Sequence, residues 1–163
     1  MILYHGSYVA IENPDLTYSR NNTDFGKGFY LTPLKAQAES WARRFADKYD
    51  SAIVSAYNFI SSPSGTLAPN ISVLEFDSHN LKWLNFIMEC RLGLPNDQKW
   101  DLIIGGVAND KVFDTLQLYF DGLIDAEAAI GRLRYNKPNF QYCFKSQALI
   151  DDTLTFSGSE VLR

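Results

Sequence analysis

The sequence predicts a single α+β domain that spans residues 1–163. Segments with the apolar spacing of helices and short apolar segments typical of strands follow one another without a steady strand–helix alternation, which a doubly wound parallel sheet would need. A hydrophobic content of 46% over 163 residues is enough for one sizeable core. No internal repeat or low-complexity segment divides the chain.

The first half of the chain predicts one long helix at residues 33–49, with Thr32 as its N-cap and Pro33 at its first position. The residues expected on its inward face recur at helical spacing: Leu34, Ala38, Trp41, Ala42, Phe45 and Tyr49. Three strands are expected, at residues 2–6, 52–60 and 71–76. Two segments rich in polar residues and containing proline are predicted as loops, at residues 8–23 and 61–65.

The second half predicts three helices, at residues 79–91, 110–121 and 126–135, and Gly122 is expected to end the second of them. Strands are expected at residues 101–107, 141–144 and 154–156. The inward faces of the first two helices are predicted from apolar spacing: Leu81, Leu84, Ile87 and Met88 on one, and Val112, Phe113, Leu116, Tyr119 and Phe120 on the other.

Charge and cysteine usage argue against several classes of protein. Fifteen Lys and Arg against nineteen Asp and Glu give a net charge of -4, which argues against a broad nucleic-acid-binding face. Cys90 and Cys143 lie far apart and are expected to be free thiols in a reducing compartment. His5 and His79 lack the spacing of a zinc site, so no metal is expected. No signal peptide or membrane-spanning segment is recognisable, so we expect a cytoplasmic protein without a membrane partner.

Two glycine-containing motifs carry most of the functional information. In Asp24-Phe25-Gly26-Lys27-Gly28-Phe29-Tyr30-Leu31-Thr32, two glycines flank a lysine and an aromatic strand follows. In Leu3-Tyr4-His5-Gly6-Ser7, a short strand is followed by a histidine and a glycine. Glycine permits close approach of a ligand to the backbone. Singly, each motif is explained by a structural turn, a core aromatic or a hydrogen-bonded histidine, and neither matches a dinucleotide or Walker fingerprint.

Together with the late strand that starts at Gln141, the two motifs resemble the ADP-ribosyltransferase fold. The resemblance is to the branch named for its His, Tyr and Glu residues, which includes the diphtheria toxin type and the poly(ADP-ribose) polymerases. Segments 83–87, 100–110 and 139–144 extend the resemblance, over nearly the full length, to small bacterial ADP-ribosyltransferase-like proteins of largely unknown function. It implies a split β-sheet core with flanking helices.

The resemblance also implies roles for particular residues, with NAD as the substrate. His5 would hydrogen-bond the adenosine ribose, the backbone of Gly6 would hold the nicotinamide carboxamide, and Tyr30 would stack on the nicotinamide ring. The remaining NAD-binding candidates are Ser7, Gly28 and Thr32. The position of the catalytic glutamate falls at Gln141, which strand alternation places on the face opposite Tyr142 and Phe144. We expect His5, Tyr30 and Gln141 to converge on one pocket.

Gln141 shapes the functional hypotheses. A glutamine can hold a ribose hydroxyl but supplies no negative charge to an oxocarbenium-like transition state, so chain-elongating polymer synthesis is not expected. The leading hypothesis is transfer of a single ADP-ribose to a macromolecular acceptor, a protein rather than nucleic acid, with residual NAD hydrolysis. By resemblance alone, the protein could be the toxin of a toxin–antitoxin or phage-conflict system, with an antitoxin protein as partner. The alternatives are a catalytically weakened module that binds NAD or ADP-ribose, and a fold relative that modifies nucleic acid.

Overall fold

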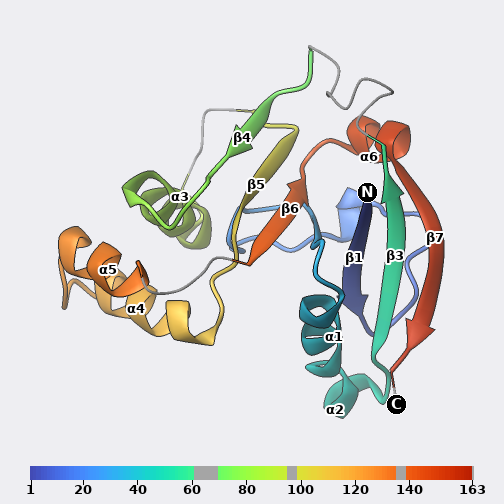
Figure 1. Ribbon diagram of the computed structural model, residues 1–163, viewed down its shortest axis with the longest axis horizontal. Helices are drawn as coiled ribbons and strands as arrows, with labels where there is room; N and C mark the ends of the chain where they lie inside the picture. Colours follow the sequence, from blue (N-terminus) through green and yellow to red (C-terminus); the bar gives the residue numbers. More distant parts are fainter. Residues whose placement is uncertain (61–69, 95–98, 135–138, 163) are drawn as a thin grey trace.

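The computed structural model describes residues 1–60, 70–94, 99–134 and 139–162. These residues form six α-helices, one short 3-10 helix and seven strands, which confirms the predicted α+β class. The strands make two sheets (Figure 1). The loop predicted at residues 61–65 lies outside the described residues. Of the described helices, none is long and apolar enough to cross a membrane.

The first sheet is antiparallel and holds both chain ends (Figure 1). Its strands, in the order β1-β3-β7, are β1 (Ile2–Ser7), β3 (Ile53–Phe59) and β7 (Leu154–Val161). Helix α1 (Lys35–Arg43) packs beside β1, and α2 (Ala46–Tyr49) follows it. A 3-10 helix at Leu16–Tyr18 lies in the segment predicted as a loop.

The second sheet has the order β2-β6-β5-β4. Its strands are β2 (Phe29–Leu31), β6 (Phe140–Phe144), β5 (Leu102–Gly106) and β4 (Val73–Glu75), and only the β4–β5 pair is parallel. Three helices pack with this sheet around one core: α3 (Leu81–Leu92), α4 (Asp110–Phe120) and α5 (Ala126–Leu133). Helix α6 (Gln147–Thr153), which the sequence did not predict, joins β6 to β7.

The long helix predicted at 33–49 is wrong in three respects. It is two helices, because the N–H groups of Arg44 and Phe45 bond carbonyls three residues back and tighten the chain after Arg43. Its N-cap is Leu34, which makes no side-chain cap bond. Its buried face consists of Ala38 and Ala42, whereas Leu34, Trp41 and Tyr49 are exposed by 45%, 45% and 42%. Small residues suffice there because α1 approaches β1 closely.

Most of the other predicted elements are confirmed to within two residues. The exception is the last strand, predicted at 154–156, which continues to Val161. Gly122, with φ +71°, follows the end of α4 as predicted. Leu81 and Phe113 were predicted to be buried and are instead exposed by 48% and 40%. Phe113 is turned towards the neighbouring helix α3, where the Arg91 guanidinium lies 5.1 Å from its ring centre.

Candidate functional site

The two sheets meet where β1 and β2 touch at one pair of residues. Tyr4 and Thr32 form an isolated antiparallel bridge, in which each N–H donates to the other's carbonyl at 2.8 and 2.9 Å. The next pair to exchange hydrogen bonds in such a ladder would be Gly6 and Tyr30. No such bonds form between these two residues, so the strands part at this point.

The parting of the strands leaves backbone groups of Gly6 without partners. Successive residues of a strand direct their N–H and C=O groups to opposite sides, so those of Gly6 point to the β2 side, as those of Tyr4 do. On the opposite side, β1 pairs with β3 through His5 and Ser55. Among the described residues, neither the N–H nor the C=O of Gly6 has a hydrogen-bond partner. Gly6 is itself buried, so its N–H and C=O form a buried edge with one donor and one acceptor.

His5 spans the gap between the two sheets. Its Nδ1 lies 2.7 Å from the Tyr30 carbonyl oxygen, and its ring stacks on Phe29 with ring centres 4.6 Å apart. Because a carbonyl only accepts, Nδ1 carries the hydrogen, which leaves a lone pair on Nε2 in the neutral ring. Burial lowers the pKa of His5, and the nearby Arg20 lowers it further, against the raising effect of the Tyr30 carbonyl. His5 is therefore neutral at pH 7, with Nε2 as an acceptor.

The Tyr30 hydroxyl is held by the glycine-rich loop. It accepts from the Phe25 N–H at 2.9 Å, donates to the Gly26 carbonyl at 2.6 Å and lies 2.9 Å from the Thr23 hydroxyl. The ring packs against the core of the second sheet and runs nearly parallel to Phe25 at 6.5 Å. Burial raises the pKa of the Tyr30 phenol well above its ordinary value, so it stays protonated through the neutral range.

Gln141 is buried and paired with a carboxylate. Its Nε2 donates to Asp24 Oδ2 at 3.0 Å. As predicted, alternation places it opposite Tyr142 and Phe144, and it shares a face with Cys143. Cys143 is the register partner of Tyr30, so Gln141 and Tyr30 lie on the same face of the second sheet.

Asp24 is the site residue for which sequence reasoning assigned no role. Its carboxylate, 13% exposed, accepts from Gln141, from the Ala108 N–H at 3.2 Å and from Arg91 of α3 in an ion pair. These partners lie 67 to 117 residues away in the sequence, so no local spacing marks them. The sequence signal was the place of Asp24 as the first residue of the glycine-rich motif.

The remaining predicted residues have visible structural roles. A Cβ at Gly28 would lie 2.4 Å from Cys143 Sγ, so glycine is needed where β2 begins to approach β6. The Thr32 hydroxyl donates to the Phe140 carbonyl and accepts from the Leu34 N–H, both at 3.1 Å. Ser7 is buried at the end of β1, beside the unpaired edge of Gly6.

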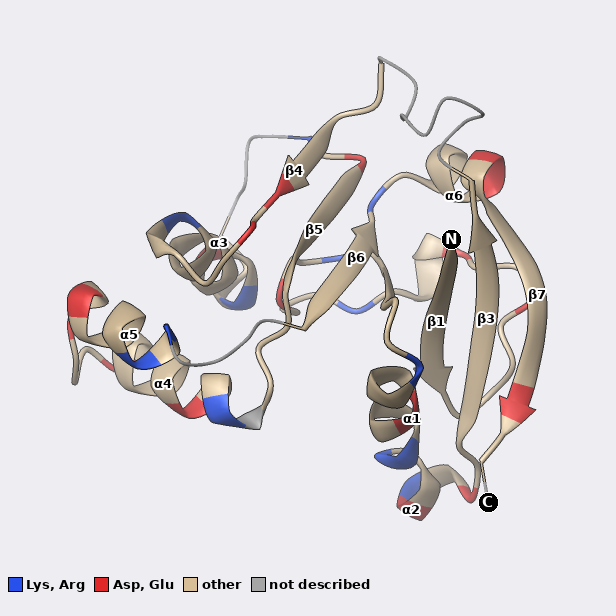
Figure 2. Cartoon of the chain, in the orientation of Figure 1, with Lys and Arg blue, Asp and Glu red and all other residues tan. Residues whose placement is uncertain are grey.

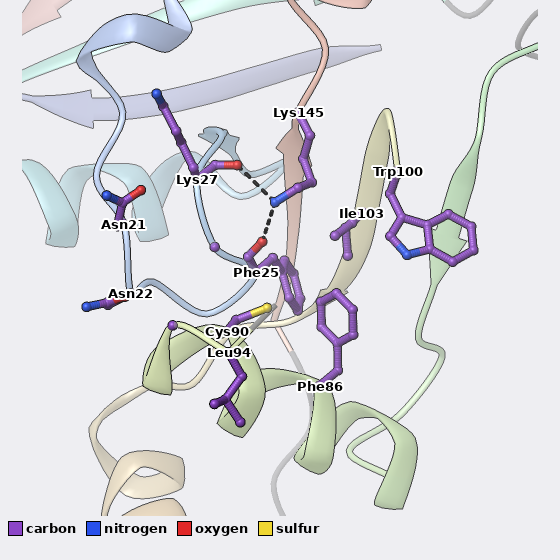
Figure 3. Close-up of a pocket in the computed structure, with 12 residues that line it drawn as sticks. Asn21, Asn22, Phe25, Lys27, Phe86, Cys90, Leu94, Trp100, Ile103 and Lys145 are labelled. Carbon is purple, nitrogen blue, oxygen red and sulfur yellow. Dashed lines mark hydrogen bonds between the residues drawn. The ribbon is translucent and has the colours of Figure 1, made fainter. Parts of the chain in front are cut away.

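A cavity of about 420 Å³ lies between the glycine-rich loop and helix α3 (Figure 3). Lys145 stands at its wall and donates to the carbonyls of Phe25 and Lys27 at 2.7 and 2.9 Å. Aromatic rings line it together with the Cys90 thiol, whose pKa burial raises to about 11. These rings belong to Phe25, Phe86 and Trp100. His5, Tyr30 and Gln141 do not line this cavity.

The structure links the three predicted catalytic residues in a chain of contacts. His5 contacts the backbone of Tyr30, the Tyr30 hydroxyl contacts Phe25, and the neighbouring Asp24 holds Gln141. The His5 ring lies on Phe29, which alternates to the opposite face from Tyr30. The expectation that the three side chains face one pocket stays a prediction.

The fold and this junction define an α+β domain in which two sheets part beside an unpaired glycine edge. The chain belongs to a family described as a protein of unknown function (DUF3990), whose sequence profile matches residues 1–156. Neither the curated proteins nor the solved structures gave a significant match to the chain.

Proposed function

We propose that this protein is an NAD-dependent mono-ADP-ribosyltransferase with a split-sheet core of the ADP-ribosyltransferase type. The observation that supports this most is the unpaired N–H and C=O of Gly6 at the point where β1 and β2 separate. A carboxamide has one carbonyl and one amino group and complements such an edge. The resemblance of the His5–Gly6 and Gly26–Tyr30 motifs to this class leads to the same assignment.

His5 and Gln141 would contact the two riboses of NAD. His5 offers Nε2 as an acceptor for a hydroxyl of the adenosine ribose, because its Nδ1 is occupied by Tyr30. In the reaction, the bond between C1′ of the nicotinamide ribose and the pyridinium nitrogen breaks, and its electron pair stays with nicotinamide, which leaves neutral. The acceptor's nucleophilic atom bonds to C1′ and its proton passes to solvent. Gln141 would hold a ribose hydroxyl while positive charge builds on the sugar.

A second candidate, a module that binds NAD or ADP-ribose without transfer, is favoured by one observation. The Asp24 carboxylate beside Gln141 is paired with Arg91, so its charge is largely balanced. A transition state with developing positive charge then gains less from it than from a free carboxylate. Substrate binding, which relies on Gly6 and His5, is unaffected by this pairing.

The charge distribution favours a protein as acceptor. Lys and Arg are spread over α1, α3, α4 and α5 and are interspersed with Asp and Glu (Figure 2). Polynucleotide binding draws on several neighbouring cations that contact consecutive phosphates. A protein toxin with its own antitoxin remains one role that such an enzyme could have.

The test is incubation of the purified protein with NAD labelled in its adenylate part and a cell lysate. Label on a macromolecule that protease destroys supports a protein acceptor, and label sensitive to nuclease supports the nucleic-acid alternative. Nicotinamide release is measured in parallel. If NAD binds by calorimetry but no nicotinamide is released with any lysate, the binding module is the correct assignment.

The two histidines of the chain provide a matched pair of variants. His5→Ala removes Nε2 and should weaken NAD binding by about 0.5–1.5 kcal/mol, the net value of one hydrogen bond. His79→Ala removes a buried histidine whose ring centre lies 4.3 Å from that of Trp83 and that belongs to neither motif, so NAD affinity should stay at the wild-type value. Equal NAD affinity in wild type and both variants would argue against the assignment of His5.

A further inference from the structure

We propose that Asp24 is a positioning residue for this reaction. Its carboxylate holds the amide nitrogen of Gln141 and thereby leaves the carbonyl oxygen, Oε1, to accept the hydrogen bond from the nicotinamide ribose. The inference rests on the proposed ADP-ribosyltransferase activity and names the atom of Gln141 that acts in it.

The donor and acceptor chemistry fixes the orientation of the amide. A carboxylate only accepts hydrogen bonds, so the group 3.0 Å from Asp24 Oδ2 must be the nitrogen of Gln141 and not its oxygen. Among the described residues, no group donates to Gln141 Oε1. A ribose hydroxyl can donate to this oxygen as it would to one oxygen of a glutamate.

Asp24 also gives the amide part of the charge that a glutamine lacks. A hydrogen bond from an amide to a carboxylate polarises the amide, which places more negative charge on its oxygen. The Asp24 carboxylate accepts from Gln141 through Oδ2, and its other partners, the Ala108 N–H and Arg91, tie it to the rest of the domain. Because Arg91 balances much of the Asp24 charge, this polarisation gives Oε1 only a fraction of the negative charge of a free carboxylate.

A purely structural role for Asp24 makes a different prediction. If Asp24 only connects the loop to α3, weakening its ion pair with Arg91 should lower kcat as much as changing Asp24 itself. Arg91→Lys keeps the positive charge but loses the forked geometry, so it weakens the tie and leaves the contact with Gln141 in place. Asp24→Asn removes the charge and lets the Gln141 amide adopt either orientation.

The kinetic test compares these two variants by nicotinamide release. Asp24→Asn should lower kcat about 10- to 100-fold, the range expected when a hydrogen bond to a charged group is lost, with little change in the KM for NAD. Arg91→Lys should keep kcat near the wild-type value while lowering Tm. Equal kcat in Asp24→Asn and wild type, or equal loss in both variants, would overturn the inference. If Asp24→Asn does not fold, Asp24→Glu keeps the charge for Arg91, displaces the carboxylate by one methylene and should show the same loss of kcat.

A second readout needs no activity. Gln141→Glu places a second carboxyl group against Asp24, and two such groups share a proton, so the pKa of one rises in the folded state. The stability of Gln141→Glu should therefore fall as pH rises from acid to neutral, because a raised folded pKa contributes stability only below it. The double variant Asp24→Asn with Gln141→Glu exchanges the two groups and should lose this pH dependence. Identical pH dependence of Tm in the single and double variants would show that the two side chains do not meet.

The two failures can be told apart. If wild type neither binds NAD nor releases nicotinamide, the proposed function is wrong, whatever the pH dependence of Tm. If wild type is active and Asp24→Asn is equally active, the function stands and Asp24 has no positioning role.

Discussion

The gap between β1 and β2 and the loop at residues 23–28 differ in how their polar groups are satisfied. At the gap, the N–H and C=O of Gly6 have no partners among the described residues, and His5 has one ring nitrogen occupied. At the loop, the Asp24 carboxylate has at least two partners, and so do the Tyr30 hydroxyl and the Lys145 ammonium, which bond the loop backbone. An unpaired group can still form a hydrogen bond with a ligand or with water, whereas groups that already have partners hold the local conformation.

This difference suggests that the two regions have different roles within the site. The gap would supply binding contacts, because its groups gain partners only when a ligand arrives. The loop would supply rigidity, because it ties β2, β6 and α3 together through side chains. Variants at the gap should then change NAD binding, and variants in the loop should change stability first. Gly6 is the exception, since its N–H and C=O face the gap, but a side chain at this position would point at helix α1.

The largest effect is expected for Gly6→Ala. A Cβ there would lie 2.1 Å from the Ala38 carbonyl oxygen and 2.9 Å from the Ala42 nitrogen, and helix backbone cannot move aside cheaply. The free energy of unfolding should fall by about 3 kcal/mol, which corresponds to a fall in Tm of roughly 6–12 °C for a chain of this size.

The matched control for that change is Gly131→Ala in α5. A Cβ at Gly131 meets no atom of the described residues within 4 Å, and alanine is a better helix former, so stability should rise by up to about 1 kcal/mol. Thermal unfolding of both variants checks the pair. A Gly6→Ala protein as stable as wild type would mean that α1 does not press on β1 as described.

Lys145→Met is expected to have the next largest effect. The Lys145 ammonium donates to the carbonyls of Phe25 and Lys27. In the variant both carbonyls lose a charged donor, which should lower the free energy of unfolding by about 2 kcal/mol. Lys27→Met removes an exposed side chain of the same loop and should change stability by less than about 0.5 kcal/mol. Urea unfolding gives both values, and equal stability of the two variants would show that Lys145 does not secure the loop.

Tyr30→Phe should cost less, about 1–2 kcal/mol, because it removes one hydroxyl that bonds the loop. Since burial raises the pKa of Tyr30, its contribution is complete below about pH 10 and is lost as pH rises through the folded pKa. The stability difference between wild type and Tyr30→Phe should therefore narrow in alkali. Tyr18→Phe, at an 87% exposed tyrosine, should show neither effect. If the stability difference between wild type and Tyr30→Phe stays constant up to strongly alkaline pH, the Tyr30 hydroxyl is not buried and hydrogen-bonded as described.

The comparison also shows what the sequence could predict. Strands β1, β3 and β5 and helices α3 and α4 follow from apolar periodicity, since their burial depends on spacing within each segment. Helix α6, with seven residues, is too short for that signal. The break after Arg43 was missed because both halves share one helical spacing, and the inward face was misjudged because close approach at Gly6 favours alanine over large side chains.

The candidate site divides in the same way. His5, Gly6, Tyr30 and Gln141 could be proposed from the sequence because each lies in or begins a short motif. The partners of Asp24 and Lys145 could not be found, because the contacts join residues that are 67 to 120 positions apart. Such contacts depend on how β2, β6 and α3 pack, and a single sequence contains no local record of that packing.

The smallest expected effect is a pH dependence of NAD binding at the gap. The pKa of His5 is lowered from its usual value near 6.5, mainly by burial. Its Nε2 therefore stays an acceptor until the pH falls to this lowered pKa. Protonation removes the lone pair, and the affinity for NAD should fall by about 0.5–1.5 kcal/mol as the pH passes downward through the folded pKa of His5. Calorimetric titration with NAD between about pH 7.5 and pH 5 measures this. His5→Ala should bind more weakly at neutral pH and lose most of the pH dependence, whereas His79→Ala, which changes the other histidine, should retain it. A His5→Ala protein with the full pH dependence of wild type would assign the titration to another group and remove His5 from the proposed NAD contacts.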